Sequence, residues 1–447
     1  MDGFSTRGAS NLIEIMARIP ESILSPSSNT DEINLSTAEN WVIRNEVLDI
    51  LKSSFEKGLQ AHHLDWPRGF WGDPELLEIL AEVFNKYFKP HATVEPNNVV
   101  VGPGAAACLD AILYNICDSG DGVLVPCPYW SMVKCPNRWE NITDELSYVD
   151  GYDAFFRTHS GVNPVSVPMP KLEESLGPDL IAALEEKYQS STRPIKALVL
   201  SNPHNPLGRC YSKDTLEQCL KFCQQHEIHL ISDEVFALSV FASADLADPS
   251  TFVSALSLHP KLLDCDPGRV HVVWSISKDL AATGVRLACI ATQNKDLRDA
   301  VALIASVNVS TLSTIVSKEL LTCSRLPSLL QLNSIRLAEA YVTLTSFFKT
   351  SGISYFPSNS TTFVMAKLAP LAQSWGDEED ALRQYLQAGV LVAPGRAYHV
   401  PEDQKGWMRV SFAVNKTLLA EAIIRIGRVF QGMRPGKKAN EEEVSKD

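Results

Sequence analysis

The chain has 447 residues, enough for two domains and a substantial hydrophobic core. Hydrophobic residues make up 45% and charged residues 21%, which is typical of a soluble globular enzyme, and no apolar run approaches the length of a membrane span. The net charge of −13 argues against nucleic acid and against an anionic membrane as partners, because both require clustered lysine and arginine.

The N-terminus and the cysteines indicate the compartment. Residues 1–7 lack the basic-then-apolar order of a secretion signal. The ten cysteines are scattered and several lie inside apolar runs, so we expect reduced thiols and a cytoplasmic location. Cys219 and Cys223 are one helical turn apart, but no second Cys/His pair stands at metal-ligand spacing. We therefore expect core-facing thiols and no metal site.

The elements follow in chain order. Residues 1–45 are predicted to form an N-terminal arm with one short helix and a bend rich in proline and serine at 20–28. Helical periodicity follows over Glu46–Leu59 and Pro74–Tyr87. From about residue 98, strand-like runs alternate with helical stretches; the strands are expected at 99–101, 122–125, 197–200, 228–232 and 270–276, and the helices at 106–116 and 213–225. This alternation predicts a mainly parallel sheet with helices on both faces.

The last third of the chain has a different pattern. Helices dominate after residue 296, and a late pair of strands is expected near 362–365 and 408–412. Residues 435–447 are polar and charged and are predicted to be a disordered tail.

The most informative run covers residues 275–286 and reads Ser-Ile-Ser-Lys-Asp-Leu-Ala-Ala-Thr-Gly-Val-Arg. It places Lys278 at a turn between two apolar strand-like runs, just after Ser275 and Ser277 and eight residues before Arg286. A lysine there can form a Schiff base with an aldehyde, while hydroxyls and a guanidinium can hold a phosphate. Pyridoxal phosphate carries both groups and is the predicted cofactor. A solvated lysine after a strand is the simpler alternative for Ser-x-Ser-Lys alone.

Three further positions carry chemistry. Gly104 follows a strand and opens a helix with Ala105 and Ala106, where backbone amides and the helix dipole can bind an anion, although a plain tight turn is the alternative. Asp233 ends a buried-looking strand, and a pyridinium nitrogen would supply the partner that a buried carboxylate needs. Arg409 lies inside an apolar strand, and its planar fork fits a carboxylate.

These runs resemble the class I/II aminotransferase family of fold-type I pyridoxal-phosphate enzymes, over roughly residues 5–430. Within the family the chain is most similar to the 1-aminocyclopropane-1-carboxylate synthases and their fungal relatives. The runs that carry this likeness are Arg7-Gly-Ala-Ser10, Leu35-Ser-Thr-Ala-Glu-Asn40 and Pro203-His-Asn-Pro-Leu-Gly208.

The resemblance implies a three-layer α/β/α fold with a large cofactor domain and a smaller α+β domain. The implied boundaries are an arm at 1–45 that packs with the small domain, the large domain at 46–318 and the small domain at 319–434. It also implies a homodimer with active sites at the subunit interface and an α-amino acid as substrate.

The resemblance also assigns roles to single residues. Lys278 holds the cofactor and removes the Cα proton, and Asp233, with Glu234 as the neighbouring alternative, pairs with the ring nitrogen. Arg409 binds the substrate α-carboxylate and Glu39 lies near the substrate side chain. The remaining cofactor contacts are the phosphate residues Gly104, Ala105, Ala106, Ser275, Ser277 and Arg286, the ring-stacking Trp130 and the ring-hydroxyl donor Asn205.

The sequence departs from the family pattern in three places. Phe236 stands where the family has a tyrosine that hydrogen-bonds the ring oxygen. Residues 64–72 contain no tyrosine to reach the partner's phosphate, so Trp66 or Phe70 takes that position. An apparent insertion at 131–151 could form a flap over the substrate, or it could be a plain surface loop.

These departures favour a specialised reaction. The predicted activity is a carbon–sulfur β-elimination lyase of fungal secondary metabolism, similar to the lyases of gliotoxin-type pathways. The alternatives are an aminotransferase for a bulky or aromatic amino acid and a γ-elimination and cyclisation enzyme of the aminocyclopropane-carboxylate type. A catalytically silent binding protein is a further hypothesis, which the joint presence of Lys278, Asp233, Asn205, Arg286 and Arg409 argues against.

Overall fold

The computed structural model of the chain describes residues 3–14, 31–130 and 151–433. The predicted bend at 20–28, the tail at 435–447 and all but the last residue of the predicted insertion lie outside these ranges.

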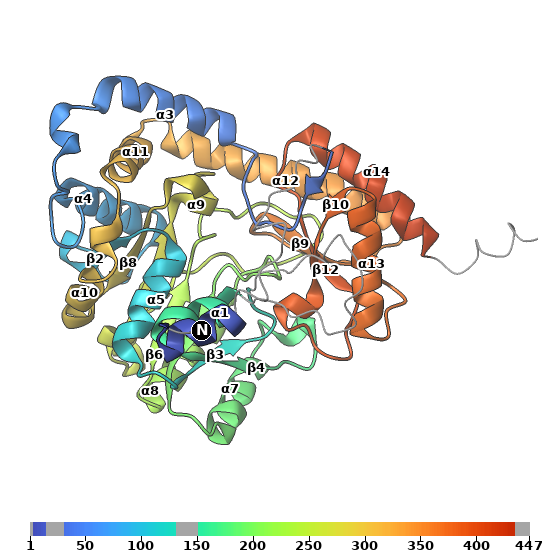
Figure 1. Cartoon of the computed structure of the whole chain (residues 1–447), viewed down its shortest axis with the longest axis horizontal. Helices are drawn as coiled ribbons and strands as arrows, with labels where there is room; N and C mark the ends of the chain where they lie inside the picture. The colour runs from blue at the N-terminus through green and yellow to red at the C-terminus, as the bar shows by residue number, and fades with distance from the viewer. Residues whose placement is uncertain (1–2, 15–30, 131–150, 434–447) are drawn as a thin grey trace, which may run out of the picture.

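Helices and strands alternate along the chain, as Figure 1 shows. The strands are β1 (Ile33–Asn34), β2 (Val99–Gly102), β3 (Gly122–Pro126), β4 (Asn163–Val167), β5 (Ile195–Ser201), β6 (His229–Asp233), β7 (Val270–Ser275), β8 (Ala288–Thr292), β9 (Phe363–Lys367), β10 (Val390–Leu391), β11 (Ala393–Pro394) and β12 (Trp407–Ser411). The α-helices are α1 (Thr6–Glu14), α3 (Arg44–Gly58), α4 (Pro74–Val83), α5 (Ala105–Ile116), α6 (Gly151–Phe155), α7 (Asp179–Ser190), α8 (Lys213–Gln225), α9 (Ile276–Asp279), α10 (Lys295–Ala302), α11 (Thr311–Thr322), α12 (Leu326–Ser351), α13 (Trp375–Gln387) and α14 (Lys416–Gly432).

Seven strands form the central sheet, in the order β2-β8-β7-β6-β5-β3-β4. β8 runs antiparallel to its neighbours β2 and β7, and the other neighbouring pairs are parallel. Because β8 is reversed, its amino end meets the carboxyl ends of the other strands along one edge. Ligands of open α/β sheets bind outside the carboxyl ends of the strands. The edge shared by β2, β8, β7, β6 and β5 is therefore the place to look for a site.

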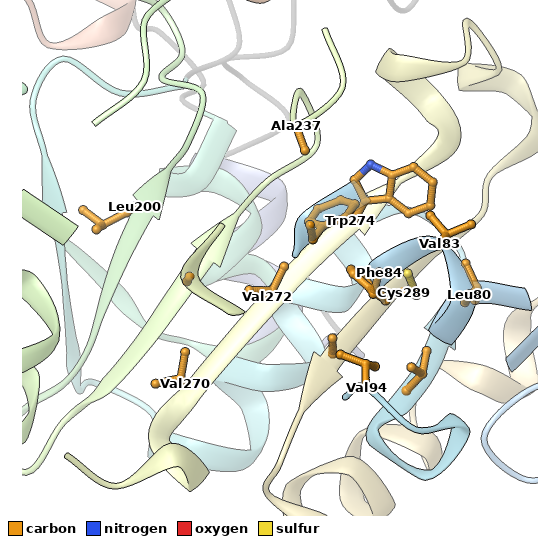
Figure 2. Packing of buried hydrophobic residues seen from close by; sticks show 14 of the residues in the cluster. Leu80, Val83, Phe84, Val94, Leu200, Ala237, Val270, Val272, Trp274 and Cys289 are labelled. Carbon is orange, nitrogen blue, oxygen red and sulfur yellow. The ribbon is translucent and has the colours of Figure 1, made fainter. Parts of the chain in front are cut away.

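Alternating side chains cover both faces of this sheet, because successive strand residues point in opposite directions. On β5, Leu198 and Leu200 join the larger hydrophobic cluster with α4, α7, α8 and α11, whereas Val199 joins a second cluster with α5 and α10 on the other face. Figure 2 shows the larger cluster around Trp274 of β7, with Phe84 close by. The two clusters make the three layers, with the sheet in the middle.

Local signals position the helices that frame the site edge. Asp73 caps α4 by accepting a hydrogen bond from the backbone amide of Leu76, and Pro74 occupies the first helical position. Ser212 caps α8 in the same way through the amide of Thr215. These caps explain why the observed starts of both helices agree with the periodicity of the sequence.

The C-terminal part of the chain forms a smaller unit around its own core. β9, β12 and β11 form an antiparallel sheet in the order β11-β12-β9, and β10 pairs in parallel with β1 of the N-terminal arm. Helices α12, α13 and α14 pack on these strands (Figure 1). Arm residues thus pair with small-unit strands despite lying more than 350 residues away in the sequence.

Helix α12 joins the two units. Its early residues Leu326 and Leu329 belong to the core of the large sheet, and Leu337, Leu344 and Phe348 belong to the core of the smaller unit. The passage between the two cores therefore lies inside one continuous helix. The predicted boundary after residue 318 falls earlier, within α11.

The predicted fold class is confirmed in its layers, in the mainly parallel sheet and in the smaller α+β unit. Within the described ranges, no helix taken singly has the length and apolarity needed to cross a membrane; by those two criteria one sharply bent pair, Lys295–Asn308 with Thr311–Thr322, qualifies.

Candidate active site

Lys278 lies at the sheet edge in the short helix α9, directly after β7. Its Nζ donates a hydrogen bond to the backbone carbonyl of Ala38 at 2.7 Å. The amide of Asn40 donates to the carbonyl of Lys278 at 3.0 Å, so the N-terminal arm crosses directly over the lysine. Burial, the charge of Arg409 and that of Arg286 lower the pKa of Lys278 to about 8, against the opposing effect of nearby carboxylates.

Asp233 is the last residue of β6, at its carboxyl end, and Glu234 follows it directly. Burial raises the pKa of its carboxyl to about 6, although hydrogen bonds and the charge of Lys278 act in the other direction. Its Oδ2 accepts a hydrogen bond of 2.7 Å from the phenol of Tyr152. Glu234 is held elsewhere, by the hydroxyls of Ser232 and Ser254. Of these two neighbouring carboxylates, Asp233 is the one whose charge acts on Lys278.

Arg409 lies in β12 of the smaller unit and is 3% exposed. Its Nη1 donates to Oδ1 of Asn205 at 2.8 Å, its Nη2 donates to the carbonyl of Ser36, and its Nε is buried without a partner in the described structure. The rings of Phe363 and Tyr398 lie 4.6 and 4.9 Å from the guanidinium carbon. Within the described ranges no carboxylate pairs with Arg409, so this buried cation lacks an anion.

The start of α5 and Arg286 form a second cationic place at the same edge. Gly104 caps the helix with φ 111°, and a Cβ there would overlap the guanidinium of Arg286, whose Cζ would be 2.8 Å away. Arg286 also donates to the carbonyls of Thr283 and Pro103. The free amides at the helix start, which include those of Ala105 and Ala106, and this guanidinium together suit a phosphate.

The two serines before the lysine have different tasks. The hydroxyl of Ser275 caps α9 by accepting from the amide of Ser277, and it bonds the carbonyl of Leu287. The hydroxyl of Ser277 lies 2.7 Å from that of Ser275, whose single proton can serve only one of Ser277 and the Leu287 carbonyl at a time. The structure therefore ties Ser275 to the backbone and leaves Ser277 as the hydroxyl better suited to a phosphate.

Aromatic residues surround the lysine and the aspartate. Trp130 packs edge-on against Tyr152 at 5.4 Å, which brings it next to Asp233. Phe236 is buried and packs edge-on against Phe363, the ring beneath Arg409. Since Phe236 has no hydroxyl, it supplies no hydrogen bond to a ring oxygen. The side-chain oxygen of Asn205 accepts from Arg409, and its amide nitrogen is the group that the resemblance assigns to the ring oxygen.

Three predicted substrate residues differ from the rest in their hydrogen bonds or in their exposure to solvent. Glu39 accepts hydrogen bonds from Trp41 at 2.6 Å and from Arg44 at 2.7 Å; burial would raise the pKa of its carboxyl, but these bonds outweigh it and lower the pKa. Trp66 and Phe70 are solvent-exposed in the single chain. The structure therefore gathers the other predicted residues at one edge, whereas Trp66 and Phe70 do not join them within one subunit.

Sequence reasoning missed two groups at this site. One is Tyr152, which follows the segment interpreted as an insertion and belongs to no motif. The other is the backbone of the arm, whose carbonyls at Ser36 and Ala38 accept from Arg409 and Lys278. A residue's type carries no signal for a backbone carbonyl, so only the fold reveals this second group.

The comparisons with known proteins agree with this geometry. The model for aminotransferase class I and II matches residues 31–426. The chain belongs to that family. A "Probable aminotransferase aclI" from Aspergillus oryzae is 44% identical over 430 residues, which cover 96% of this chain and 98% of that protein. The 1-aminocyclopropane-1-carboxylate synthase 1 of Prunus mume is 26% identical, covering 95% of this chain and 81% of that protein, and it confirms the predicted likeness to that branch.

A solved structure shows the same fold. An aspartate aminotransferase of Thermus thermophilus superposes with a TM-score of 0.73 at 23% identity, covering 96% of this chain and 100% of that chain. The family normally binds pyridoxal phosphate, and the residues present fit it. An amine, a buried carboxylate and a cationic helix start lie along one sheet edge, and Gly104 leaves room beside Arg286.

Replacing Gly104 with alanine is expected to weaken binding of pyridoxal phosphate about tenfold or more, because the new Cβ would displace the Arg286 guanidinium from the helix start. Equilibrium dialysis of the apoenzyme measures this. Gly120→Ala is the matched control, since Gly120 also has a positive φ, of 98°, but has open space around it. Equal affinity in the Gly104→Ala protein and its parent would remove this turn from the phosphate site.

The capture of pyridoxal phosphate by Lys278 is expected to speed up as the pH rises, with a midpoint near 8, because only the neutral amine is a nucleophile. Arg409→Gln should move that midpoint upward, since it removes a positive neighbour of the amine. The rate at which borohydride-fixed cofactor accumulates at each pH measures both effects. Arg425→Gln, which removes a cation paired with Glu421 on α14, controls for the loss of charge elsewhere. A midpoint near that of an ordinary lysine would contradict the assignment.

Proposed function

We propose that the protein is a pyridoxal-phosphate enzyme that removes the Cα proton of an α-amino acid and carries out transamination. The observation that supports it most strongly is the buried, anion-free guanidinium of Arg409 close to the amine of Lys278. A substrate with a free carboxylate matches the first group, and a base near neutrality matches the second. The names of the relatives, which are called aminotransferases, support transamination over other outcomes.

The residues divide the work by charge. When bound, pyridoxal phosphate supplies an aldehyde for an amine and a ring that delocalises negative charge from Cα. Arg409 binds the substrate carboxylate with its planar fork and replaces its bond to the Ser36 carbonyl by that ligand. Lys278, with a pKa of about 8, is neutral often enough near pH 7–8 to take a proton from Cα and return it. Asp233 would pair with the ring nitrogen, and Arg286 with the α5 amides would hold the phosphate.

A carbon–sulfur β-elimination is the second candidate, and Phe236 is the observation that favours it. The aminotransferases that this family is named after ordinarily have a phenol at this position, and its absence here changes the hydrogen bonding of the ring oxygen. In an elimination the β substituent leaves before any proton is returned to the substrate. Fewer proton transfers then depend on the hydrogen bonds of the ring oxygen. The relatives' names do not support this candidate, which therefore stays behind transamination.

A product assay separates the candidates. The holoenzyme is incubated with amino acids plus a 2-oxo acid, with cysteine S-conjugates, and with S-adenosylmethionine. Transamination gives a new amino acid and a new oxo acid, β-elimination gives pyruvate, ammonia and a thiol, and cyclisation gives aminocyclopropane carboxylate. Pyruvate with ammonia from the S-conjugate alone would replace the first candidate by the second.

Arg409→Ala is expected to weaken amino-acid binding by roughly 2–5 kcal/mol, the cost of leaving a buried charge without its partner, which is about 30-fold or more in affinity. Arg409→Lys should recover part of it, because it keeps the charge but not the fork. KM for the amino acid measures the effect, with Arg383→Ala on α13 as the control for a lost exposed arginine. Unchanged KM in Arg409→Ala would exclude this residue as the carboxylate site.

We also propose that two copies of the chain form a dimer through an apolar patch. The patch consists of Leu59, Leu64, Trp66, Phe70, Leu303, Val307 and Leu312, all exposed. Trp66 is 84% exposed and Leu64 is 83% exposed. The hydroxyl of Ser306 donates to the carbonyl of Phe70, so the two stretches that carry the patch lie side by side. Large apolar side chains gathered in this way mark an association surface, and two-fold dimers are the commonest assembly.

Trp66→Asp is expected to convert the dimer to a monomer at micromolar concentration, because a charge would be buried in the apolar interface. Sedimentation equilibrium gives the mass directly. Leu262→Asp is the matched control, since Leu262 is 79% exposed but lies away from the patch residues in sequence. If the parent protein is itself a fully active monomer, the patch has another purpose and the dimer is disproved.

A further inference from the structure

The carboxylate of Asp233 carries a hydrogen bond from a residue outside the family motifs. The phenol of Tyr152 donates to Oδ2 at 2.7 Å, and both residues are buried, Tyr152 being 1% exposed. The other bond to this carboxylate in the described structure is a long one of 3.4 Å, from the amide of Val235 to Oδ1. One oxygen of Asp233 is therefore fixed by Tyr152.

Tyr152 is itself held on several sides. Its ring stacks on Phe156 at 5.1 Å with an interplanar angle of 12°, and Trp130 packs against it edge-on. The next residue, Asp153, accepts a hydrogen bond from Tyr129 at 2.9 Å and lies 3.1 Å from Nε2 of His399 in the smaller unit. Helix α6 thus carries one side chain to the cofactor edge and the next to a contact between the two units.

The charged groups around Tyr152 determine the protonation state of its phenol. Burial and the nearby charge of Asp233 raise the pKa of Tyr152 well above its usual value, so the phenol stays protonated and can only donate to the carboxylate. Burial raises the pKa of Asp233, and the bond from Tyr152 opposes this rise. A phenol binds an ionised carboxylate more strongly than a neutral one. The other charged neighbours are Lys278, which also favours the ionised form, and Glu234, which disfavours charge beside it.

We propose that Tyr152 is a positioning residue for the cofactor: it keeps Asp233 ionised and leaves Oδ1 for the nitrogen of the cofactor ring. This inference rests on the proposed pyridoxal-phosphate site. Helix α6 then contributes to the site, because the orientation and charge of Asp233 depend on Tyr152.

The test uses the purified holoenzyme without amino acid. In Tyr152→Phe, which keeps the ring stack but loses the donor, the dissociation constant for pyridoxal phosphate should rise about tenfold or more. The pH midpoint of the visible absorbance of the bound cofactor should also move upward. With Asp233 less ionised, the ring nitrogen loses its proton, and the nitrogen that joins the cofactor to Lys278 then keeps its own proton to a higher pH.

Tyr385→Phe is the matched control. Tyr385 is also fully buried and its phenol also donates a hydrogen bond, of 2.9 Å to the carbonyl of Leu368, but it lies in the core of the smaller unit. It should lower the melting temperature by an amount similar to that of Tyr152→Phe and leave the cofactor affinity and the spectral midpoint unchanged. Equal spectral midpoints in Tyr152→Phe and the parent would overturn the proposal.

A double variant separates positioning from a general structural effect. In an Asp233→Asn background the donor has no carboxylate to act on, so Tyr152→Phe should cause little further loss of cofactor affinity. Fully additive losses would show that Tyr152 acts through packing alone and would refute the inference. If the parent protein fails to bind pyridoxal phosphate at all, the proposed function is wrong, which is a different outcome from either of these.

Discussion

The site depends on an excess of positive charge at one edge of the sheet, where Arg409 is buried, Lys278 is largely buried and Arg286 is exposed. Lys278, Arg409 and Arg286 meet there, and Asp233 is the buried carboxylate among them. Burial disfavours the charged form of the Lys278 amine, and the charges of Arg409 and Arg286 add to this effect, so the pKa of Lys278 falls to about 8. A dianionic phosphate and a carboxylate would relieve this excess. The same electrostatic arrangement therefore prepares an amine for reaction and creates affinity for two anionic groups.

The N-terminal arm stabilises two of these cations, Lys278 and Arg409, when no anionic ligand is bound. Carbonyls at Ser36 and Ala38 accept from Arg409 and Lys278, while the arm is anchored to the smaller unit by the pairing of β1 with β10. Backbone carbonyls carry partial negative charge, so they accept hydrogen bonds from both cations in the absence of a full anion. The arm also connects the lysine of the large unit to the arginine of the small one. Movement of the smaller unit would therefore change the hydrogen bond between Lys278 and the Ala38 carbonyl.

The sequence predicted those features whose cause is local. Lys278, Asp233 and Arg409 each lie in or at the end of an apolar strand, where a charge is conspicuous, and the strand and helix periodicities around them place the sheet edge. It did not predict contacts between segments far apart in the chain, such as Tyr152 with Asp233, 81 residues away, or Lys278 with Ala38, 240 residues away. Such contacts follow from packing of whole elements, which no short motif encodes. The contact of Glu39 with Arg44 is different, because the two residues are only five positions apart and the conformation of that short segment decides it.

In the proposed pyridoxal-phosphate site, the loss of a phenol at Phe236 and the presence of one at Tyr152 would affect opposite sides of the cofactor ring. A hydroxyl at residue 236 would act on the ring oxygen, whereas Tyr152 donates to Asp233, the proposed partner of the ring nitrogen. Removing a donor from the oxygen makes the adjacent nitrogen hold its proton more strongly. An ionised Asp233 would keep the ring nitrogen protonated. The positive charge of the ring would then lower the pKa of the nitrogen that joins the cofactor to Lys278. The two departures therefore oppose each other electrostatically, so the missing hydroxyl at Phe236 does not by itself make the site incapable of transamination.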